Sequence, residues 1–327
     1  MKPVAVIPVA GAGTRLKPHT ITTPKALLQV AGKPILGHIL DQIAAVKPER
    51  VVLVIGPGPH GERIRAYGAS REDLALSCVV QEEPKGLGHA VAQAKEAVGR
   101  APCLILLGDT IVRADLRDLV TGGSKVGVKE VEDPRRFGVA EVVGGRIASL
   151  VEKPEHPKSN LALVGLYYLE DSPLLFEALA HVERTGTRTR GEIQLTDALA
   201  EMITRGADLR PFPVEGWYDC GKTDALLETN RALLDVSGNH VERPGVVIVP
   251  PVALDPSADV LHSVIGPHAS IGARAHVRRS VVKNSIVNEG ATVEDVLLDL
   301  SVVGENTIVR GGYQRLNVGD SSEVEVS

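Results

Sequence analysis

Cysteine is scarce in this chain of 327 residues, and its few copies lie far apart. The three cysteines are Cys78, Cys103 and Cys220, and none belongs to a C-x-x-C pair. This spacing argues against a disulfide framework and against a structural zinc site, and it favours buried, reduced thiols. The histidines form no H-x-x-H or H-E-x-x-H spacing, so none is predicted to be a zinc ligand.

An excess of positive charge and a long apolar run are also missing. The formal net charge is −5, so no broad basic surface for nucleic acid or anionic lipid is expected, and any phosphate binding must be local. No stretch reaches the roughly eighteen consecutive apolar residues of a membrane-spanning helix. The N-terminus enters an apolar run without a charged leader. We therefore expect a cytoplasmic protein that binds neither nucleic acid nor membrane.

The first feature that is present is a strand followed by a glycine loop. Residues 4–9 are a short apolar run typical of a buried strand, and small residues follow it: Ala10, Gly11, Ala12, Gly13 and Thr14. The loop can present backbone N–H groups to an anion, and Arg15 and Lys25 add two cations for a phosphate chain. The glycines alone are equally typical of a tight turn. The loop matches neither a dinucleotide fingerprint nor a Walker loop, so a nicotinamide cofactor is not expected.

Apolar runs and helical spacings alternate through the first third of the chain. Strands are expected at residues 51–55, 76–80 and 103–107, and helices at residues 34–46, 62–67 and 86–98. This alternation predicts an α/β fold with a doubly wound nucleotide-binding sheet. Four β runs, at residues 125–131, 137–143, 147–150 and 161–169, predict an added mixed sheet. Helices are expected at residues 173–183, 193–205 and 222–235.

The last part of the chain carries a repeat instead of a helical pattern. Ile271, Val287 and Val303 recur every 16 residues, and Val277, Val293 and Val309 keep the same interval. A fixed β period with apolar corners is typical of a β-solenoid, whereas an ordinary β-sandwich would not keep the register. The segment SVIGPHASIGARAHV resembles the hexapeptide pattern of left-handed parallel β-helices. So short a stack exposes its ends and faces, and we expect a homo-oligomer that buries them.

The glycine loop and the residues after it carry a family resemblance. GAGTRLKPHT, followed by PKALL, resembles the N-terminal signature of the sugar-1-phosphate nucleotidylyltransferases. The resemblance covers nearly the whole chain. It implies a catalytic domain over residues 1–236, with a doubly wound mixed sheet, and a left-handed β-helix with a polar tail over residues 237–327.

Two aspartates are candidates for a metal site. Asp109 ends an apolar run in LILLGDT, where a carboxylate either serves a cation or caps the following segment together with Thr110. The family resemblance favours the metal and adds Asp219, from WYDCG, as the second ligand. It implies that Mg²⁺ binds Asp109 and Asp219, and that Arg15 and Lys25 stabilise charge on the transferred phosphoryl group.

Other segments resemble the substrate-binding motifs of the same family. Gln81 and Gly86, in QEEPKGLGHA, resemble the base-reading segment, where Gln81 offers a donor and an acceptor and Gly86 permits close approach of the ring. The residues assigned by resemblance to the sugar phosphate are Gly138, Glu152, Lys153, Leu163 and Arg190. Without the resemblance, these segments also fit a polar loop, a charged hairpin end and the first turn of a helix.

The resemblance implies transfer of a nucleotidyl group from dTTP or UTP to a sugar 1-phosphate, with glucose 1-phosphate the closest pattern. Pyrophosphate leaves, and no covalent enzyme intermediate is expected. Ala10 replaces a glycine that many thymidylyl enzymes carry, which leaves the base open. The alternatives are a mannose-1-phosphate guanylyltransferase and a non-catalytic regulatory or assembly subunit. Retention of the loop cations together with the two aspartates argues against the non-catalytic subunit.

Overall fold

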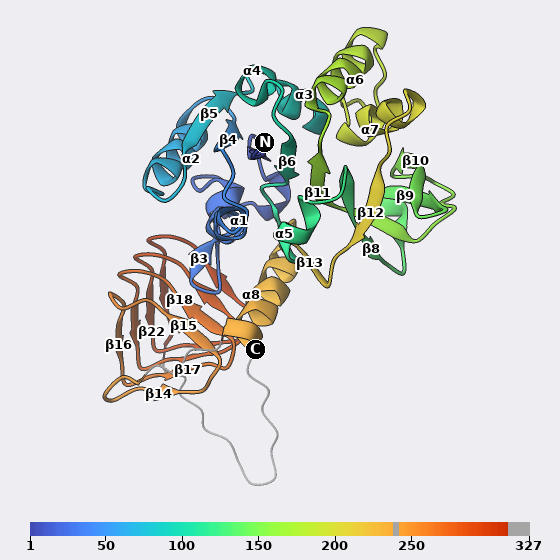
Figure 1. Ribbon diagram of the computed structural model, residues 1–327. Coiled ribbons are helices and arrows are strands. Elements are labelled where there is room, and N and C mark those ends of the chain that lie inside the picture. The colour runs from blue at the N-terminus through green and yellow to red at the C-terminus, as the bar shows by residue number, and fades with distance from the viewer. Residues whose placement is uncertain (238–241, 313–327) are drawn as a thin grey trace. The chain divides into compact units, whose positions relative to one another are not determined.

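The computed structural model describes residues 1–237 and 242–312, and it separates into two compact units, residues 1–229 and 230–327 (Figure 1). Helix α8 (Thr223–Ser237) spans this division. The predicted boundary between residues 236 and 237 stays a prediction, and the polar tail predicted at the C-terminus lies outside the described residues. No helix in the described ranges is long and apolar enough to cross a membrane.

The N-terminal unit is organised around a nine-stranded mixed sheet. Its centre is parallel: β1 (Val4–Pro8) lies between β4 (Arg50–Ile55) and β6 (Cys103–Leu106), and β5 (Leu76–Val80) extends the sheet beyond β4. Strands β1, β4 and β6 are nearly continuous runs of buried apolar residues, as expected where helices cover both faces, whereas the edge strand β5 is only partly buried. The doubly wound α/β prediction is confirmed.

The later β runs join this same sheet and do not form the added sheet that their separate position in the sequence suggested. They are β8 (Lys125–Glu130), β9 (Gly138–Val143), β10 (Arg146–Glu152) and β11 (Leu161–Leu169), and a further strand that was not predicted, β12 (Arg210–Pro213), pairs with β8. Strand β11 pairs antiparallel with β6, β8 and β9, and nearly all its residues are buried. A strand buried on both faces needs partners at both edges, so β11 connects the two groups of strands.

Helices cover the two faces of the sheet. Alternate side chains of β1, β4 and β6 form one apolar core with α3 (Leu87–Ala92), α4 (Lys95–Val98), α6 (Ser172–Thr185) and α7 (Leu195–Thr204). Helix α2 (Pro59–Ala69) approaches the opposite side chains of β4, Leu53 and Ile55, through its glycines. Helix α1 (Ile35–Ala44) lies beside α2, since Gly37 faces the Tyr67 hydroxyl. The remaining helix of this part, α5 (Leu116–Leu119), is a single turn.

The helix predicted over residues 86–98 is interrupted. The Gln93 side chain donates to the His89 carbonyl at 3.1 Å, which is the acceptor that the Gln93 backbone N–H would use in a regular helix. That N–H donates to Ala90 O instead, at 3.2 Å, and α3 ends there. A polar side chain that competes for the backbone therefore divides the segment into α3 and α4.

Several short elements were not anticipated. Strands β2 (Gln29–Val30) and β3 (Lys33–Pro34) form a hairpin, and three 3₁₀ turns occur at Thr14–Leu16, Lys25–Leu27 and Pro134–Arg136. The most consequential are β7 (Thr110–Arg113) and β13 (Gly216–Asp219), which form an antiparallel pair apart from the main sheet. Three-residue and four-residue elements carry too little periodicity to be recognised in a sequence.

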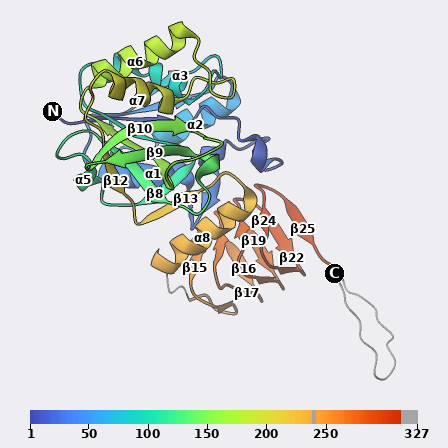
Figure 2. The same cartoon turned by 90° about the vertical axis from the view of Figure 1, so that its right-hand side faces the viewer.

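The C-terminal unit is a left-handed β-helix of three parallel sheets, each with four strands (Figure 2). The walls consist of β14 (Val247–Ile248), β17 (Val264–Ile265), β20 (Val281–Val282) and β23 (Leu297–Leu298); of β15 (Val252–Leu254), β18 (Ala269–Ile271), β21 (Ile286–Val287) and β24 (Val302–Val303); and of β16 (Asp259–Leu261), β19 (His276–Arg278), β22 (Thr292–Glu294) and β25 (Ile308–Arg310).

The register of the β-helix confirms the repeat. Ile271 pairs with Val287 and Val287 with Val303, and Val277, Val293 and Val309 pair in the same way. On the wall formed by β14, β17, β20 and β23, the first two intervals are 17 residues long, since Val247 pairs with Val264 and Val264 pairs with Val281. The third interval, from Val281 to Leu297, is 16 residues. The inward side chains of these coils form a separate apolar core.

The cysteines are free thiols. Cys103 and Cys220 are buried and Cys78 is half-buried, and burial raises the pKa of the Cys103 and Cys220 thiols to about 12. Thiols with so high a pKa are protonated and unreactive at neutral pH. Cys103 and Cys220 are buried as predicted, whereas Cys78 is only half-buried.

Candidate active site

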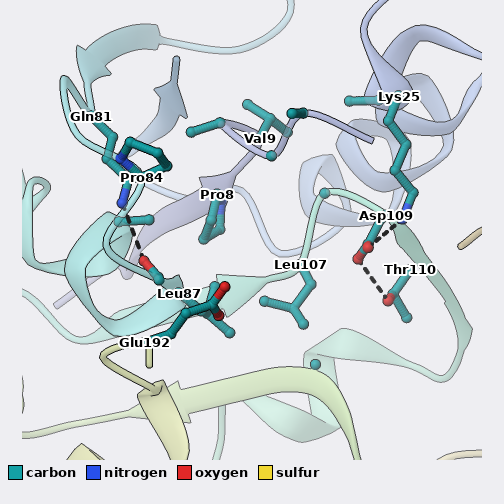
Figure 3. A pocket seen from close by; sticks show the side chains of 18 of the residues that line it. Pro8, Val9, Lys25, Gln81, Pro84, Leu87, Leu107, Asp109, Thr110 and Glu192 are labelled. Atoms are coloured by element: carbon teal, nitrogen blue, oxygen red, sulfur yellow. Dashed lines mark hydrogen bonds and ion pairs between the residues drawn. The ribbon is translucent and has the colours of Figure 1, made fainter. Parts of the chain in front are cut away.

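A cavity of about 870 Å³ lies at the carboxyl ends of the parallel strands (Figure 3). Its wall includes the loop after β1, Gly56 after β4, Gln81 after β5 and Asp109 after β6. Ligands of open parallel sheets bind at this edge, because the loops that follow neighbouring strands converge there. The strand order therefore brings together segments that are far apart in the chain.

The glycine loop contributes Ala10, Gly11 and Arg15 to the wall, whereas Gly13 and Thr14 do not line the cavity. Gly13 has a positive φ of 61°, and a Cβ there would lie 3.0 Å from Lys25 Cβ. The Thr20 hydroxyl donates to Gly13 O at 2.8 Å. Gly13 is thus required for packing the loop against the Lys25 segment and does not itself face the cavity.

Lys25 and Asp109 form an ion pair inside the cavity wall. Lys25 Nζ lies 2.5 Å from Asp109 Oδ2, and the side chain of Lys25 is only 11% exposed (Figure 3). The Thr110 hydroxyl lies 3.3 Å from Asp109 Oδ1. Asp109 caps no helix, because β7 begins directly at Thr110. The Asp109 carboxylate therefore pairs with a cation, Lys25, and does not cap a helix.

Asp219 reaches the same place from the last strand of the unit. Strand β13 pairs Asp219 with Thr110, and the Cys220 N–H donates to Asp109 O at 3.1 Å. Burial, and next the negative charge of Asp109, raise the pKa of Asp219, while Lys25 and Arg15 act in the opposite direction. Two carboxylates are thus held close enough to repel each other, with two cations beside them.

Gly221 explains how closely this group is packed. A Cβ on Gly221 would lie 2.9 Å from Asp219 Oδ1 and 3.2 Å from Arg15 Nη2. Both distances are shorter than ordinary van der Waals contact. A glycine therefore allows the carboxylate and the guanidinium to lie against the backbone.

The chemistry of these donors fits a hard divalent cation. In the described parts of the chain, no group of three or more His, Cys, Asp or Glu side chains is arranged so that it could hold a metal ion by itself. Mg²⁺ is usually held by one or two carboxylates, with substrate phosphates and water completing its six ligands. Burial and the charge of Asp109 raise the pKa of Asp219, and a bound cation would lower it. Asp109 and Asp219 thus suit a cation that arrives with a phosphate chain.

The opposite end of the cavity carries Gln81 and Gly86. Gln81 is buried, and its Nε2 donates to Gly86 O at 3.2 Å and lies 2.9 Å from His89 Nδ1. Gly86 has a φ of 112°, and a Cβ there would lie 2.6 Å from Ile193 O. The requirement for glycine at this position therefore comes from packing against the segment before α7, in addition to any close approach by a base.

A third region of the wall contains the residues assigned to the sugar phosphate. Glu152 Oε2 accepts a hydrogen bond from the Thr196 hydroxyl at 2.7 Å, and Lys153 Nζ lies 3.0 Å from Glu152 Oε1. A Cβ on Gly138 would lie 2.8 Å from Leu163 Cδ1 and 3.0 Å from Glu152 Oε2. Gly138 therefore keeps this part of the cavity open beside a fixed carboxylate.

Arg190 lies elsewhere. It is exposed and lines a shallow surface depression with Asp133, Arg135, Arg136 and Glu155, not the main cavity. Of the residues predicted to bind substrate or metal, Gly13, Thr14 and Arg190 are the ones that do not line the cavity.

Trp217 and Thr196 are among the wall residues that were not predicted to belong to the site. Trp217 packs edge to face on Phe137, with ring centroids 4.7 Å apart, and its Nε1 is buried with no partner among the described residues. It is the chain's single tryptophan and lies two residues before Asp219, so its position gave a usable signal. Thr196 gave none, because its contact with Glu152 spans 44 residues.

Comparison with known proteins agrees with this geometry. Residues 4–236 match the nucleotidyl transferase family. The glucose-1-phosphate thymidylyltransferase of Streptomyces antibioticus is 32% identical over 98% of this chain and 99% of its own length. The low-salt glycan biosynthesis nucleotidyltransferase Agl11 of Haloferax volcanii is 30% identical over 97% and 98%. A solved UDP-glucose pyrophosphorylase complexed with UDP-glucose superimposes with a TM-score of 0.62 at 27% identity, over 72% of this chain and 100% of its own.

The family match extends from the first strand to helix α8, and it contains every residue of the cavity wall. With its relatives aligned over nearly their full length, the chain belongs to the nucleotidyl transferase family.

Proposed function

We propose that this protein transfers a nucleotidyl group from dTTP or UTP to a sugar 1-phosphate, with glucose 1-phosphate as the substrate, and releases pyrophosphate. The observation that carries the proposal is the convergence of Arg15, Lys25, Asp109 and Asp219 in one cavity. That cavity also has a buried amide at one end and a fixed carboxylate at the other. Relatives whose names specify glucose 1-phosphate or UDP-glucose support the choice of substrates.

In the proposed reaction, an oxygen of the sugar 1-phosphate attacks the α-phosphorus of the triphosphate, and pyrophosphate leaves. Lys25 and Arg15 place positive charge where negative charge grows on the α-phosphoryl group, and the removal of such a donor typically costs about 10² to 10³ in rate. Lys25 is already oriented by Asp109, so it needs little reorganisation when the substrate arrives. Positioning and electrostatics suffice, and no side chain forms a bond to phosphorus.

Asp109 and Asp219 would hold the metal ion, for which Mg²⁺ is our proposal. A bound Mg²⁺ would supply positive charge that neutralises the phosphates. At the sugar end, Glu152 would accept hydrogen bonds from hydroxyl groups, and Lys153 would pair with the sugar phosphate.

Pyrophosphate release tests the proposal. The protein is incubated with Mg²⁺ and glucose 1-phosphate, together with dTTP, UTP, GTP, CTP or ATP, beside an Asp109→Asn variant. We expect release with a pyrimidine triphosphate and its loss in the variant. Release with GTP and mannose 1-phosphate alone would replace the proposal with the guanylyl alternative, and no release with any sugar phosphate would favour the non-catalytic subunit.

We further propose that the protein is a cytoplasmic homo-oligomer that associates through the β-helix. One wall presents an outward column of apolar side chains, Val247, Val264, Val281 and Leu297, of which Leu297 is 83% exposed. A second copy could cover this column, since exposed apolar columns are otherwise rare on solvated sheets. The test is the molar mass from light scattering. Leu297→Lys should reduce it to the monomer, whereas Thr292→Lys, on a polar wall, should not.

A further inference from the structure

His89 lies behind the cavity wall and touches the base-reading residue. It is half-buried on α3 and does not line the cavity. Its Nδ1 lies 2.9 Å from Gln81 Nε2, and its Nε2 lies 3.2 Å from Gln93 Nε2. One imidazole thus contacts two amide groups, one in the wall and one on the outer turn of the helix.

The two amides cannot both donate to His89, because a neutral imidazole has a single acceptor nitrogen. Gln81 is 5% exposed, so water cannot replace a lost partner there, whereas Gln93 is half-buried. A buried donor without a partner costs more than a partly exposed one. His89 Nδ1 therefore accepts from Gln81 and Nε2 carries the proton, while the Gln93 amide donates to the His89 carbonyl oxygen and makes no hydrogen bond to the ring.

This arrangement uses all the donors of Gln81. One hydrogen of Nε2 goes to Gly86 O and the other to His89 Nδ1. Oε1 is the remaining polar atom of a side chain that lines the cavity, and it has no hydrogen-bond partner among the described residues. The sequence suggested that Gln81 offers both a donor and an acceptor to the base. In the structure, only the acceptor is left.

We propose that His89 is a positioning residue that orients the amide of Gln81 and so selects nucleotides whose base carries a ring N–H. Uracil and thymine have such an N–H at N3, and guanine has one at N1. Cytosine and adenine present a bare ring nitrogen, whose lone pair would face Oε1 without a proton between them. A site that is built for one hydrogen-bonding partner strongly rejects an analogue that lacks it.

The inference rests on the proposed nucleotidyl transfer and deepens it. The test compares UTP with CTP in wild type, His89→Leu and His89→Asn, by kcat/KM for pyrophosphate release and by equilibrium binding of each triphosphate. Leucine removes the acceptor at similar volume, and asparagine restores one with Oδ1 close to the position of Nδ1. The ratio of UTP to CTP is taken on a single preparation, so partial loss of folded protein cancels.

We expect wild type to prefer UTP, His89→Leu to reduce the ratio at least about tenfold, and His89→Asn to retain it within about threefold. An unchanged ratio in His89→Leu would overturn the inference, and so would equal losses in both variants. If wild type releases no pyrophosphate with any triphosphate, the proposed function fails, and the binding ratio still decides the role of His89.

Discussion

Asp219→Asn should make the N-terminal unit more stable while it abolishes turnover. The two effects have one cause, since Asp219 is held beside Asp109 in a partly buried position that raises its pKa. At neutral pH, the charged carboxylate therefore destabilises the folded state relative to the unfolded chain. Asparagine keeps the shape of the side chain and removes the charge.

The expected gain in the free energy of unfolding is about 1 kcal/mol, within the usual range for relief of a strained functional site. The partial exposure of Asp219 and the nearby charges of Lys25 and Arg15 argue against a larger value. In a unit of about this size, 1 kcal/mol raises the melting temperature by about 2 to 4 °C. The rate should fall at least about 10²-fold, because the metal site and the charge pattern are both lost.

The pH dependence identifies the cause. The cost of the ionised Asp219 is fully present above its raised folded pKa and disappears as pH falls toward the unfolded value of 3.8. At pH 7, the urea midpoint of Asp219→Asn should therefore be higher than that of wild type. The difference between the two midpoints should become smaller as the pH is lowered. Glu72→Gln, at an exposed carboxylate outside the cavity, is the control and should show no such difference. A variant that is less stable than wild type at pH 7, or that keeps its activity, would refute the reasoning.

Three other outcomes follow from the site. Gly86→Ala should lower the free energy of unfolding, measured by urea denaturation, by about 2 to 4 kcal/mol. The φ of 112° at this position is unfavourable for alanine, and the added Cβ would lie 2.6 Å from Ile193 O. A free energy of unfolding equal to that of wild type would contradict this prediction. Gly221→Ala should leave the free energy of unfolding within about 1 kcal/mol of wild type yet reduce kcat/KM about 10²-fold, because the added Cβ would displace the side chains of Asp219 and Arg15. Unchanged kinetics would exclude a role for Gly221 in positioning these two side chains. Removal of divalent ions with EDTA should stop pyrophosphate release, and Mg²⁺ should restore it; activity that persists in EDTA would exclude the metal site.

The sequence predicted the architecture well where periodicity was long. Strands β1, β4, β5 and β6 and the 16-residue register of the β-helix followed from apolar patterns that local sterics dictate. Most of the cavity wall was predictable as well, because the loops after parallel strands must converge at one edge. The family resemblance supplied the pairing of Asp109 with Asp219, which no local pattern contains.

What could not be predicted depends on contacts between distant segments. The contact of Thr196 with Glu152 and the packing of Gly86 on Ile193 require the folded backbone. The break between α3 and α4 depends on which acceptor the Gln93 side chain takes. The orientation of the Gln81 amide depends on a histidine that no catalytic or metal motif marks. Such choices are decided by hydrogen-bond competition, for which residue type alone is not informative.

The pairing of β7 with β13 places Asp219 after the last strand of the main sheet in the order of synthesis. Every strand of the main sheet has been synthesised once residue 213 is reached, since β12 ends there. Asp219 lies six residues later, in the ladder with β7. A chain that ends between these points would contain every strand of the main sheet and lack Asp219, so we expect it to release no pyrophosphate. The residues that complete the sheet are thus separate in the chain from the residue that we propose completes the metal site.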